Sequence, residues 1–417
     1  MYLSKHTVIK LNDAYSNIIG HMNYAAYKLW NVLNYERRNW KTLGLDEYPD
    51  WYYQKATHKD NIWYKQLPSQ SAQEVCKLLD KSWKSFFVLN ETGGIKNPKP
   101  PRFKDSGIAV TYMQNGIVSD PERFTVRLAI PKQLKVFMKN TYGIEEQFIY
   151  LTNPVFAFDN IKQITLNPPK DGQCDVVVVY EVPNPNYLKD NLHYLSIDLG
   201  LHNLMTCVDS LGCDSFIVGR KYLSICRYYD KKISKVQKKW YAQQSEKGVE
   251  YPKSSKHIKK LYVKKKNHVN DYLHKITDWI VKYCIKHHIH TVIIGDITGI
   301  RKDNDLGSKT NQKLHGLPYS RIYLMLEYKL SLHGIRFIMQ NEAYTSQCSP
   351  LSKSVCKSNA RKSKRIHRGL YADNKTIWNA DAVGAYNILR TYLSKNNISI
   401  PLPVKGLSSP RIINVAV

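Results

Sequence analysis

The apolar positions of the first 90 residues predict one short strand followed by helices. Val8 and Ile9 fall in a strand expected over residues 1–10. Large apolar and aromatic side chains then recur near helical spacing at Tyr24, Tyr27, Trp30 and Leu33. We therefore expect residues 11–90 to form a helical block.

The last helix of this block has clear boundary signals. Residues 70–87 have the pattern of an amphipathic helix, and Pro68 and Ser69 mark its start. The proline-rich segment 97–104 (Asn-Pro-Lys-Pro-Pro-Arg-Phe-Lys) then breaks the helical pattern. We expect the chain to change from helices to strands at this point.

Strand-like patterns dominate from this segment to about residue 190, most clearly at 124–130, 161–166 and 175–182. Short strands separated by turns favour a small β-barrel. Because residues 1–10 also have a strand pattern, we predict an N-terminal barrel made of 1–10 and 91–190. The helical block 11–90 would then be an insertion after its first strand.

The second half of the chain mixes strands and helices after a linker-like segment at 183–186. An apolar strand at 194–199 and a returning strand at 203–208 precede heavily basic helices over 221–290. Strands and helices then alternate at 290–294, 319–333, 335–339 and 380–393. The predicted fold class is multidomain α/β.

The net charge of the chain indicates what kind of molecule the protein binds. The 417 residues include 62 Lys and Arg against 34 Asp and Glu, a net charge of +28. This length is enough for two to four domains. The positive excess favours a polyanion, chiefly DNA or RNA, although a basic ribosome-associated factor is the alternative. Aromatic residues make up 12% of the chain, and they can stack on bases as well as fill cores.

No stretch approaches the roughly 20 apolar residues of a membrane span, and the N-terminus lacks the apolar region of a signal peptide. The eight cysteines are mostly scattered singly, as in proteins with reduced thiols. We expect an intracellular protein, associated with the nucleoid in a prokaryote or with the nucleus in a eukaryotic or viral host.

Three acidic residues far apart in sequence stand in apolar or motif-like settings: Asp198, Glu342 and Asp381. A carboxylate in an apolar strand is costly unless something pairs with it. Three converging carboxylates repel one another unless cations neutralise them. Mg²⁺ is the usual cation, and two such ions can cleave a phosphodiester.

Each acid also has a plainer interpretation. Asp198 could form a turn with Gly200 at a strand end, and Asp381 or Asn379 could cap the helix that follows. Asp296 competes with Glu342 for the middle position, because it ends the strand before residue 297. Gly295 and Asp296 point to opposite faces of that strand, and composition alone cannot choose between the two acids.

Residues 344–377 are polar, basic and rich in turns. Cys348 and Cys356 invite a zinc site, with His367 as an extra candidate, but their spacing lacks the two short pairs of a structural zinc site. We therefore expect no zinc. The basic run at 361–368 is either a solvated surface or a phosphate-contacting patch.

The ordered set of short segments along the chain resembles the TnpB family of transposon-encoded RNA-guided nucleases and their Fanzor relatives. The resemblance covers most of the chain, and no single segment decides it. The segments are 67–74 (Leu-Pro-Ser-Gln-Ser-Ala-Gln-Glu), 100–104 (Pro-Pro-Arg-Phe-Lys), 196–200 (Ser-Ile-Asp-Leu-Gly), 255–260 with 271–275, 295–297 (Gly-Asp-Ile), 344–348 (Tyr-Thr-Ser-Gln-Cys), 368–370 (Arg-Gly-Leu), and 379–381 (Asn-Ala-Asp) with 386–389.

This resemblance implies a domain order. A wedge-like β-barrel (1–10 and 91–190) would carry a helical recognition insertion (11–90). An RNase H-like (RuvC) nuclease core would follow. Its segments would be 191–343 and 376–395, with a basic helical insertion at 221–290, a small target-loading insertion at 344–375 and a flexible tail at 396–417.

Two departures from the family pattern matter. Many members carry the second catalytic Glu where this chain has Gly295, whereas some place a Glu just before the Tyr-Thr-Ser segment. Glu342 fits that second position, so we prefer it to Asp296. Members with a zinc ribbon carry two cysteine pairs, and here Cys356 falls at the wrong spacing.

The resemblance implies an RNA-guided, Mg²⁺-dependent DNA endonuclease, monomeric, in which Asp198, Glu342 and Asp381 hold two Mg²⁺ and the guide pairs with one strand beside a short target-adjacent motif. An inactive RNA-guided DNA-binding regulator and a guide-independent nuclease or transposase are the alternatives. The expected nucleic-acid contacts are Arg102, Lys104, Lys259, Lys260, Arg361, Lys362, Lys364, Arg365 and Arg368.

Overall fold

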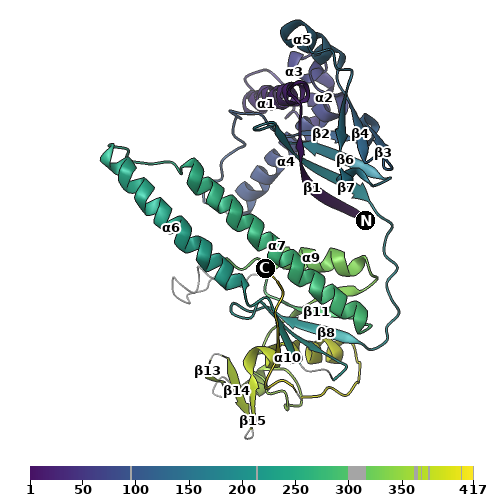
Figure 1. The fold of residues 1–417 in the computed structure, drawn as a ribbon, viewed down its shortest axis with the longest axis vertical. Coiled ribbons are helices and arrows are strands. Elements are labelled where there is room, and N and C mark those ends of the chain that lie inside the picture. The colour runs from purple at the N-terminus through teal and green to yellow at the C-terminus, as the bar shows by residue number, and fades with distance from the viewer. Residues whose placement is uncertain are drawn as a thin grey trace. The chain divides into compact units, whose positions relative to one another are not determined.

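The computed structural model describes the chain except residues 94–95, 213–214, 299–315, 361–364, 368, 374–375, 405 and 417. It contains two compact units, Met1–Asn184 and Pro185–Val417 (Figure 1). No helix in the described ranges combines the length and the apolar character needed to cross a membrane.

Helices fill the first part of the Met1–Asn184 unit, as the apolar spacing predicted. Several of them begin at an Asn or Asp whose side chain accepts a backbone N–H of the first turn, as Asn12 does from Tyr15 and Asp50 does from Tyr53. The predicted helix after Pro68 is confirmed. The helices are α1 (Asp13–Asn39), α2 (Trp51–Thr57), α3 (Ile62–Lys65), α4 (Ser69–Thr92) and, later in the unit, α5 (Lys132–Tyr142).

The strands of this unit form two antiparallel sheets, ordered β1-β7-β6-β2 and β3-β4-β5. They are β1 (Tyr2–Lys10), β2 (Val110–Met113), β3 (Ile117–Asp120), β4 (Thr125–Ala129), β5 (Phe148–Thr152), β6 (Ile161–Leu166) and β7 (Gln173–Glu181). Backbone pairing joins no strand of one sheet to the other within the described residues. The predicted closed barrel is therefore not confirmed.

One apolar core unites the helices and both sheets of this unit. Leu29 and Leu33 of α1, Leu79 of α4 and Val176 and Val178 of β7 are buried in it. Because alternate residues of a strand face the same side, β7 contributes every second residue to the core and leaves the others outside. Burial of this continuous surface is the main stabilising term of the unit.

A six-stranded sheet is the centre of the Pro185–Val417 unit, in the order β12-β11-β8-β9-β10-β16. Strands β8, β11 and β12 run parallel. The strand β9 returns antiparallel to β8, which agrees with the return predicted from the sequence. The strands are β8 (Tyr194–Asp198), β9 (Met205–Asp209), β10 (Phe216–Val218), β11 (Thr291–Asp296), β12 (Arg336–Asn341) and β16 (Arg411–Ile413).

Helices cover both faces of this sheet. Leu195, Ile197 and Ile294 pack against the side of α7 (Lys256–Lys286) and α9 (Tyr319–Ser331). Tyr194 and Ile293, their neighbours in the strands, pack against α10 (Ala380–Lys395) on the opposite face. Strands buried on both faces carry continuous apolar runs, which explains the strong strand signals at 194–199 and 290–294.

The remaining elements of the unit extend from this sheet. The helix α6 (Tyr222–Glu246) lies beside α7, and the two are the long helices of Figure 1. A small antiparallel sheet holds β13 (Arg365–His367), β14 (Leu370–Asp373) and β15 (Thr376–Asn379). The segment 396–417, which we expected to be a flexible tail, supplies β16, and this strand pairs in parallel with β10.

Candidate active site

Three neighbouring parallel strands end at the same edge of the sheet, and two of the predicted acids lie there. Asp198 is the last residue of β8, and Glu342 follows directly after β12. Between them, β11 pairs Ile294 with Ile197 on one side and Gly295 with Gln340 on the other. The carboxyl ends of parallel strands are a common position for functional side chains in α/β sheets.

Strand alternation decides which side chains share a face. Alternate residues of a strand point to the same face of the sheet. Asp198 therefore lies on the same face as Tyr194, and Gly295 on the same face as Ile293, so both positions face α10. Asp296 lies on the same face as Ile294, which is the face covered by α7 and α9. It is exposed, and its Oδ1 accepts the backbone N–H of Thr298 at 2.8 Å. Asp296 therefore does not share the face of Asp198.

The carboxyl group of Glu342 fills the space above Gly295. A Cβ atom built on Gly295 would lie 1.7 Å from Oε1 and 2.5 Å from Cδ of Glu342. Glu342 thus delivers its carboxyl group where a side chain of β11 would otherwise stand, on the α10 face. Tyr323 supports the strand end below it, since its hydroxyl donates to the Gly295 carbonyl at 2.7 Å.

The environment of Glu342 is unfavourable for an isolated charge. Its Oε1 is buried without a hydrogen-bond partner. Burial, and secondarily the negative charge of Asp296, raises the pKa of Glu342 to about 7. A buried, unpaired carboxylate oxygen is costly, so this position favours a cation or a proton.

The helix α10 brings the third acid to the same place. Asn379 caps the helix by accepting the N–H groups of Asp381 and Ala382 at 3.1 Å, so the Asp381 carboxylate is not the cap. Its Oδ2 instead accepts a hydrogen bond from Asn203 Nδ2 at 2.8 Å. One turn later, a Cβ on Gly384 would lie 3.0 Å from Asp198 Oδ2. Asp198 therefore lies directly against the helix that carries Asp381.

These residues suit a hard divalent cation. Carboxylate oxygens are the ligands that Mg²⁺ prefers, and a cation would satisfy the unpartnered Oε1 of Glu342. In the described part of the chain, however, no three His, Cys, Asp or Glu side chains are grouped closely enough to hold a metal ion. The donor chemistry fits a metal, whereas the predicted three-ligand cluster is not assembled in this structure.

Several residues that were not assigned contacts from the sequence also shape this site. Asn387 is fully buried on α10, and its Nδ2 donates to the carbonyls of Thr345 and Cys348, both at 2.8 Å. It therefore fixes the segment after Glu342 to the helix of Asp381. The small residue at 384 and the Asn at 203 were visible in the sequence, but only their tertiary contacts reveal their roles.

The two cysteines of the 344–377 region lie close together without facing one another. Cys348 is buried, and its Sγ donates to the backbone carbonyl of Cys356 at 3.4 Å. The Cys356 thiol lies between the hydroxyls of Ser354 and Ser358. His367 lies in β13, and its side chain is outside the described set.

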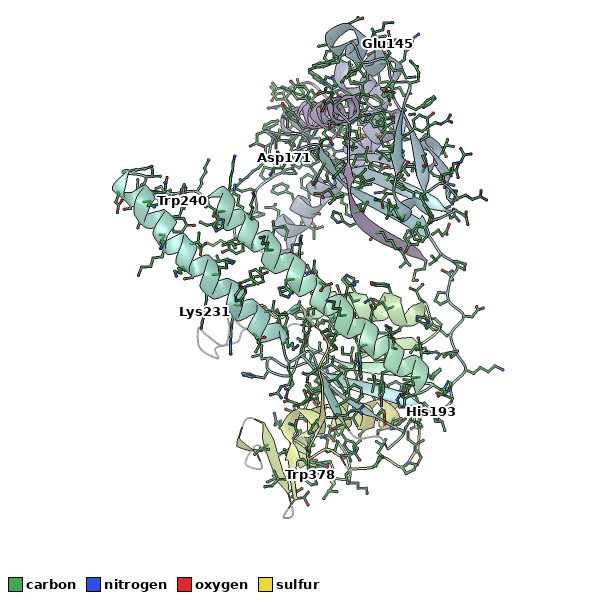
Figure 2. The ribbon with its side chains drawn as sticks, in the orientation of Figure 1. Glu145, Asp171, His193, Lys231, Trp240 and Trp378 are labelled. Atoms are coloured by element: carbon green, nitrogen blue, oxygen red, sulfur yellow. The ribbon has the colours of Figure 1, made fainter. Side chains whose placement is uncertain are left out.

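Basic side chains line the long helices. Figure 2 shows Lys231 projecting from α6, and Trp240 further along this helix donates to the Lys253 carbonyl at 2.8 Å. The predicted contacts Arg102, Lys104, Lys259 and Lys260 are all exposed. Arg361, Lys362, Lys364 and Arg368 lie outside the described residues, and Arg365 is described only as part of β13.

Comparison with known proteins gives two family matches. Residues 177–301 match the OrfB_IS605 family, a probable transposase. Residues 319–388 match the Cas12f1-like TNB domain. Together the two segments span β8, β11, α9, β12 and most of α10, the elements that carry the candidate site.

Two individual proteins are similar to this chain, one in sequence and one in fold. The TnpB-like protein MJ0751 of Methanocaldococcus jannaschii is 23% identical over 224 residues, covering 52% of this chain and 73% of the relative. A solved Cas12f1–sgRNA–target DNA complex contains a chain of similar fold, with a TM-score of 0.58, 15% identity, and coverage of 90% of this chain and 83% of that one. The transposase-family match, the TNB-domain match and the archaeal relative agree with the segments noted in the sequence, and together they support a TnpB-family nuclease.

Proposed function

We propose that this protein is an RNA-guided DNA endonuclease that cleaves double-stranded DNA by metal-assisted phosphodiester hydrolysis. One observation carries the proposal. The Glu342 carboxyl group occupies the side-chain space of Gly295, on the sheet face that Asp198 and α10 share. An acid at that position is otherwise a costly feature for a folded chain.

In this proposal the sheet is the core of an RNase H-like (RuvC) nuclease, and Asp198, Glu342 and Asp381 are the residues that would hold two Mg²⁺. When bound, such ions activate a water and stabilise the leaving oxygen of the scissile phosphodiester. The protein's own contribution is to present two carboxylates at one edge of the sheet and to carry the third on the helix α10 that packs against it. Asn203 orients Asp381 through its hydrogen bond, and Gly384 lets α10 approach Asp198.

The basic surfaces would bind the nucleic acids. Exposed Lys259 and Lys260 on α7 and exposed Arg102 and Lys104 in the Met1–Asn184 unit are suited to phosphate contacts. In RNA-guided nucleases, base pairing between guide and target reads the sequence, whereas the protein follows the backbone and a short flanking motif. We propose the same division for this chain, acting as a monomer with a guide RNA.

The test compares Glu342, whose carboxyl group lies on the α10 face of the sheet, with Asp296, which lies on the opposite face. The full-length protein is purified with its bound RNA, and a plasmid matching that RNA, with a randomised flanking sequence, is incubated with it in Mg²⁺. We expect wild type and Asp296→Asn to cut and Glu342→Gln to bind the target without cutting. Binding without cutting by wild type itself would assign the chain to the DNA-binding regulators.

Loss of cutting in Asp296→Asn but not in Glu342→Gln would move the middle ligand to β11. The absence of bound RNA from active wild-type protein would favour a guide-independent nuclease. Thermal unfolding of each variant, measured in parallel, separates a lost ligand from a lost fold.

A further inference from the structure

The helix α10 meets the three candidate acids through residues that follow one another at intervals of three. Residues at this spacing lie side by side on a helix surface. Asp381 is itself one of the acids, and a Cβ on Gly384 would lie 3.0 Å from Asp198 Oδ2. The next residue at this spacing, Asn387, connects the helix to the segment that follows the third acid, Glu342.

The Asn387 side chain is a fully buried amide with three hydrogen bonds. Its Nδ2 donates to the carbonyls of Thr345 and Cys348, both at 2.8 Å. Its Oδ1 accepts from Arg390 Nη1 at 3.1 Å. A primary amide has two N–H donors, so both are directed at the backbone of the same short turn. An apolar side chain at this position would remove both donors from these carbonyls.

Thr345 continues the connection to the acid. Its backbone N–H donates to the Glu342 carbonyl at 3.1 Å, and its Oγ1 donates to the same carbonyl at 2.8 Å. Thr345 is itself buried, so water does not compete freely for these bonds. The backbone of Glu342 is therefore held from the side of α10 as well as by the strand β12 that precedes it.

The turn between Glu342 and Cys348 contains a strained residue. Tyr344 has a φ of 65°, in the left-handed region that residues other than glycine rarely adopt. Its carbonyl accepts the N–H groups of Gln347 at 3.0 Å and Cys348 at 3.1 Å. Such conformations persist where surrounding contacts fix them. The two donors of Asn387 provide contacts of this kind, because they hold the turn on both sides of Gln347.

We propose that Asn387 is a positioning residue of the nuclease site. By fixing the turn 342–348 to α10, it sets where the Glu342 carboxyl group stands relative to Asp381 on the same helix. The amide touches no reacting atom and acts only through the turn. This inference deepens the proposed function and rests on it, because the relative position of the two acids matters to catalysis only if they share a cation.

A purely structural role for Asn387 predicts a different result, and the chain offers a matched residue. Asn23 is 1% exposed, and its Nδ2 also donates to two backbone carbonyls, those of Ile108 at 2.7 Å and Leu166 at 3.1 Å. It lies in the Met1–Asn184 unit, away from the candidate acids in the fold of its own unit. Asn387→Ala and Asn23→Ala thus remove the same kind of contact at two places.

The first measurement uses metal binding and not activity. The full-length protein, freed of RNA, is titrated with Mn²⁺, and the free ion is measured from its electron paramagnetic resonance signal. The relevant binding is the part that wild type has and Glu342→Gln lacks. We expect Asn387→Ala to weaken this binding by about 10–100-fold, as when a group supporting a metal ligand is lost. Asn23→Ala should bind Mn²⁺ as wild type does.

Thr345→Val provides a milder change in the same connection. It keeps the shape of the side chain and removes only the hydroxyl that donates to Glu342. We expect it to weaken the Glu342-dependent Mn²⁺ binding by about fivefold, the effect of one hydrogen bond. Thermal unfolding of every variant is measured in parallel, and if Asn387→Ala does not fold, Thr345→Val decides.

The second measurement uses guided cleavage of saturating target DNA. We expect the Mg²⁺ concentration that gives half-maximal cleavage to rise in Asn387→Ala, whereas target binding without Mg²⁺ stays at the wild-type level. A lower stability alone would not shift the Mg²⁺ dependence in this way.

Three results would overturn the positioning role: unchanged Mn²⁺ affinity in a folded Asn387→Ala, unchanged affinity in Thr345→Val, or an equal loss in Asn23→Ala. In each of these cases wild type still binds Mn²⁺ through Glu342, and the proposed function stands. A wild-type protein without Glu342-dependent Mn²⁺ binding would instead overturn the metal site itself, and the positioning role with it.

Discussion

A Cβ atom on Gly295 would lie 1.7 Å from Oε1 of Glu342, so the two positions share one space. The sheet register puts that space beside the last residue of β8, Asp198, on the face covered by α10. An acid can thus reach the edge of the sheet by two routes, directly from β11 or from the turn after β12. This chain uses the second route, and Gly295 is what makes room for it.

The first prediction concerns Gly295→Ala. The added methyl group must displace the end of the Glu342 side chain, which can rotate away at a cost of about 0.5–1.5 kcal/mol. We expect the free energy of unfolding to change little, whereas cleavage should fall by about 10–100-fold or more, as when a group supporting a metal ligand is lost. Urea unfolding and plasmid cleavage measure the two effects.

Gly20→Ala is the matched control, because a Cβ on Gly20 meets nothing within 4 Å. It should leave cleavage unchanged and stabilise α1 slightly. Full cleavage by Gly295→Ala would mean that the Glu342 carboxyl group is not needed at this place.

The second prediction concerns moving the acidic residue from position 342 to position 295. Glu342→Gly alone removes the carboxyl group and should abolish cleavage. Gly295→Glu alone crowds two carboxylates into one space and should destabilise the fold by about 1–3 kcal/mol. In the double variant, β11 supplies the acid directly, and we expect both stability and measurable cleavage to return. A double variant that is stable but inactive would show that the site depends on more than the presence of a carboxylate there.

The sequence predicted most elements of the Pro185–Val417 unit because strands buried on both faces carry mainly apolar runs, as at 194–198 and 291–295. It could not choose between Asp296 and Glu342, since that choice depends on which face of β11 the helix α10 covers. This is a tertiary fact, set by the packing of Ile293 against Ile388 and Leu389. The resemblance favoured Glu342, and the register puts the space above Gly295, which the Glu342 carboxyl group fills, on the face covered by α10.

The predicted N-terminal barrel is not confirmed, for a different reason. Alternating patterns identify strands but not whether the ends of a sheet meet. The strands β3, β4 and β5 pair only among themselves in the described part of the chain, so no closed sheet confirms the expected barrel.

The third prediction concerns thiol reactivity. Hydrogen bonds from Ser354 and Ser358 lower the pKa of the Cys356 thiol to about 7, whereas burial raises the pKa of Cys76, Cys207 and Cys284. At pH 7, Cys356 should therefore be about half thiolate and react with iodoacetamide about tenfold faster than an ordinary exposed cysteine with a pKa near 8.5.

Mass spectrometry of the peptide containing Cys356, over a series of pH values, measures this rate. The matched variant replaces both Ser354 and Ser358 with alanine. It should shift the midpoint of the alkylation rate against pH upward, toward 8.5. A midpoint near 8.5 in the wild type would contradict the role given to the two hydroxyls.

The fourth prediction concerns acid stability of the helical block. Glu36 of α1 accepts a hydrogen bond from Gln54 Nε2 at 2.7 Å and lies 3.1 Å from His58 Nε2. Burial by itself raises the pKa of Glu36, but the hydrogen bonds from His58 and Gln54 outweigh it, so the pKa lies below its ordinary value. The folded state therefore favours the charged form of this carboxyl group.

A lowered folded-state pKa fixes the sign of the pH dependence. The carboxylate stabilises the fold above the unfolded-state pKa of about 4.3, and this contribution is lost as the pH falls through the lower folded-state pKa. We expect Glu36→Gln to cost about 1.5–3 kcal/mol near pH 6, the range for hydrogen bonds to a charged group, and almost nothing well below pH 4. Urea unfolding of both proteins across this range measures the difference.

Glu145→Gln, which removes an exposed partner of Lys139, is the control and should have little effect at any pH because water screens that pair. A cost for Glu36→Gln that stays constant down to pH 3 would mean that packing, and not the charge, makes Glu36 stabilising.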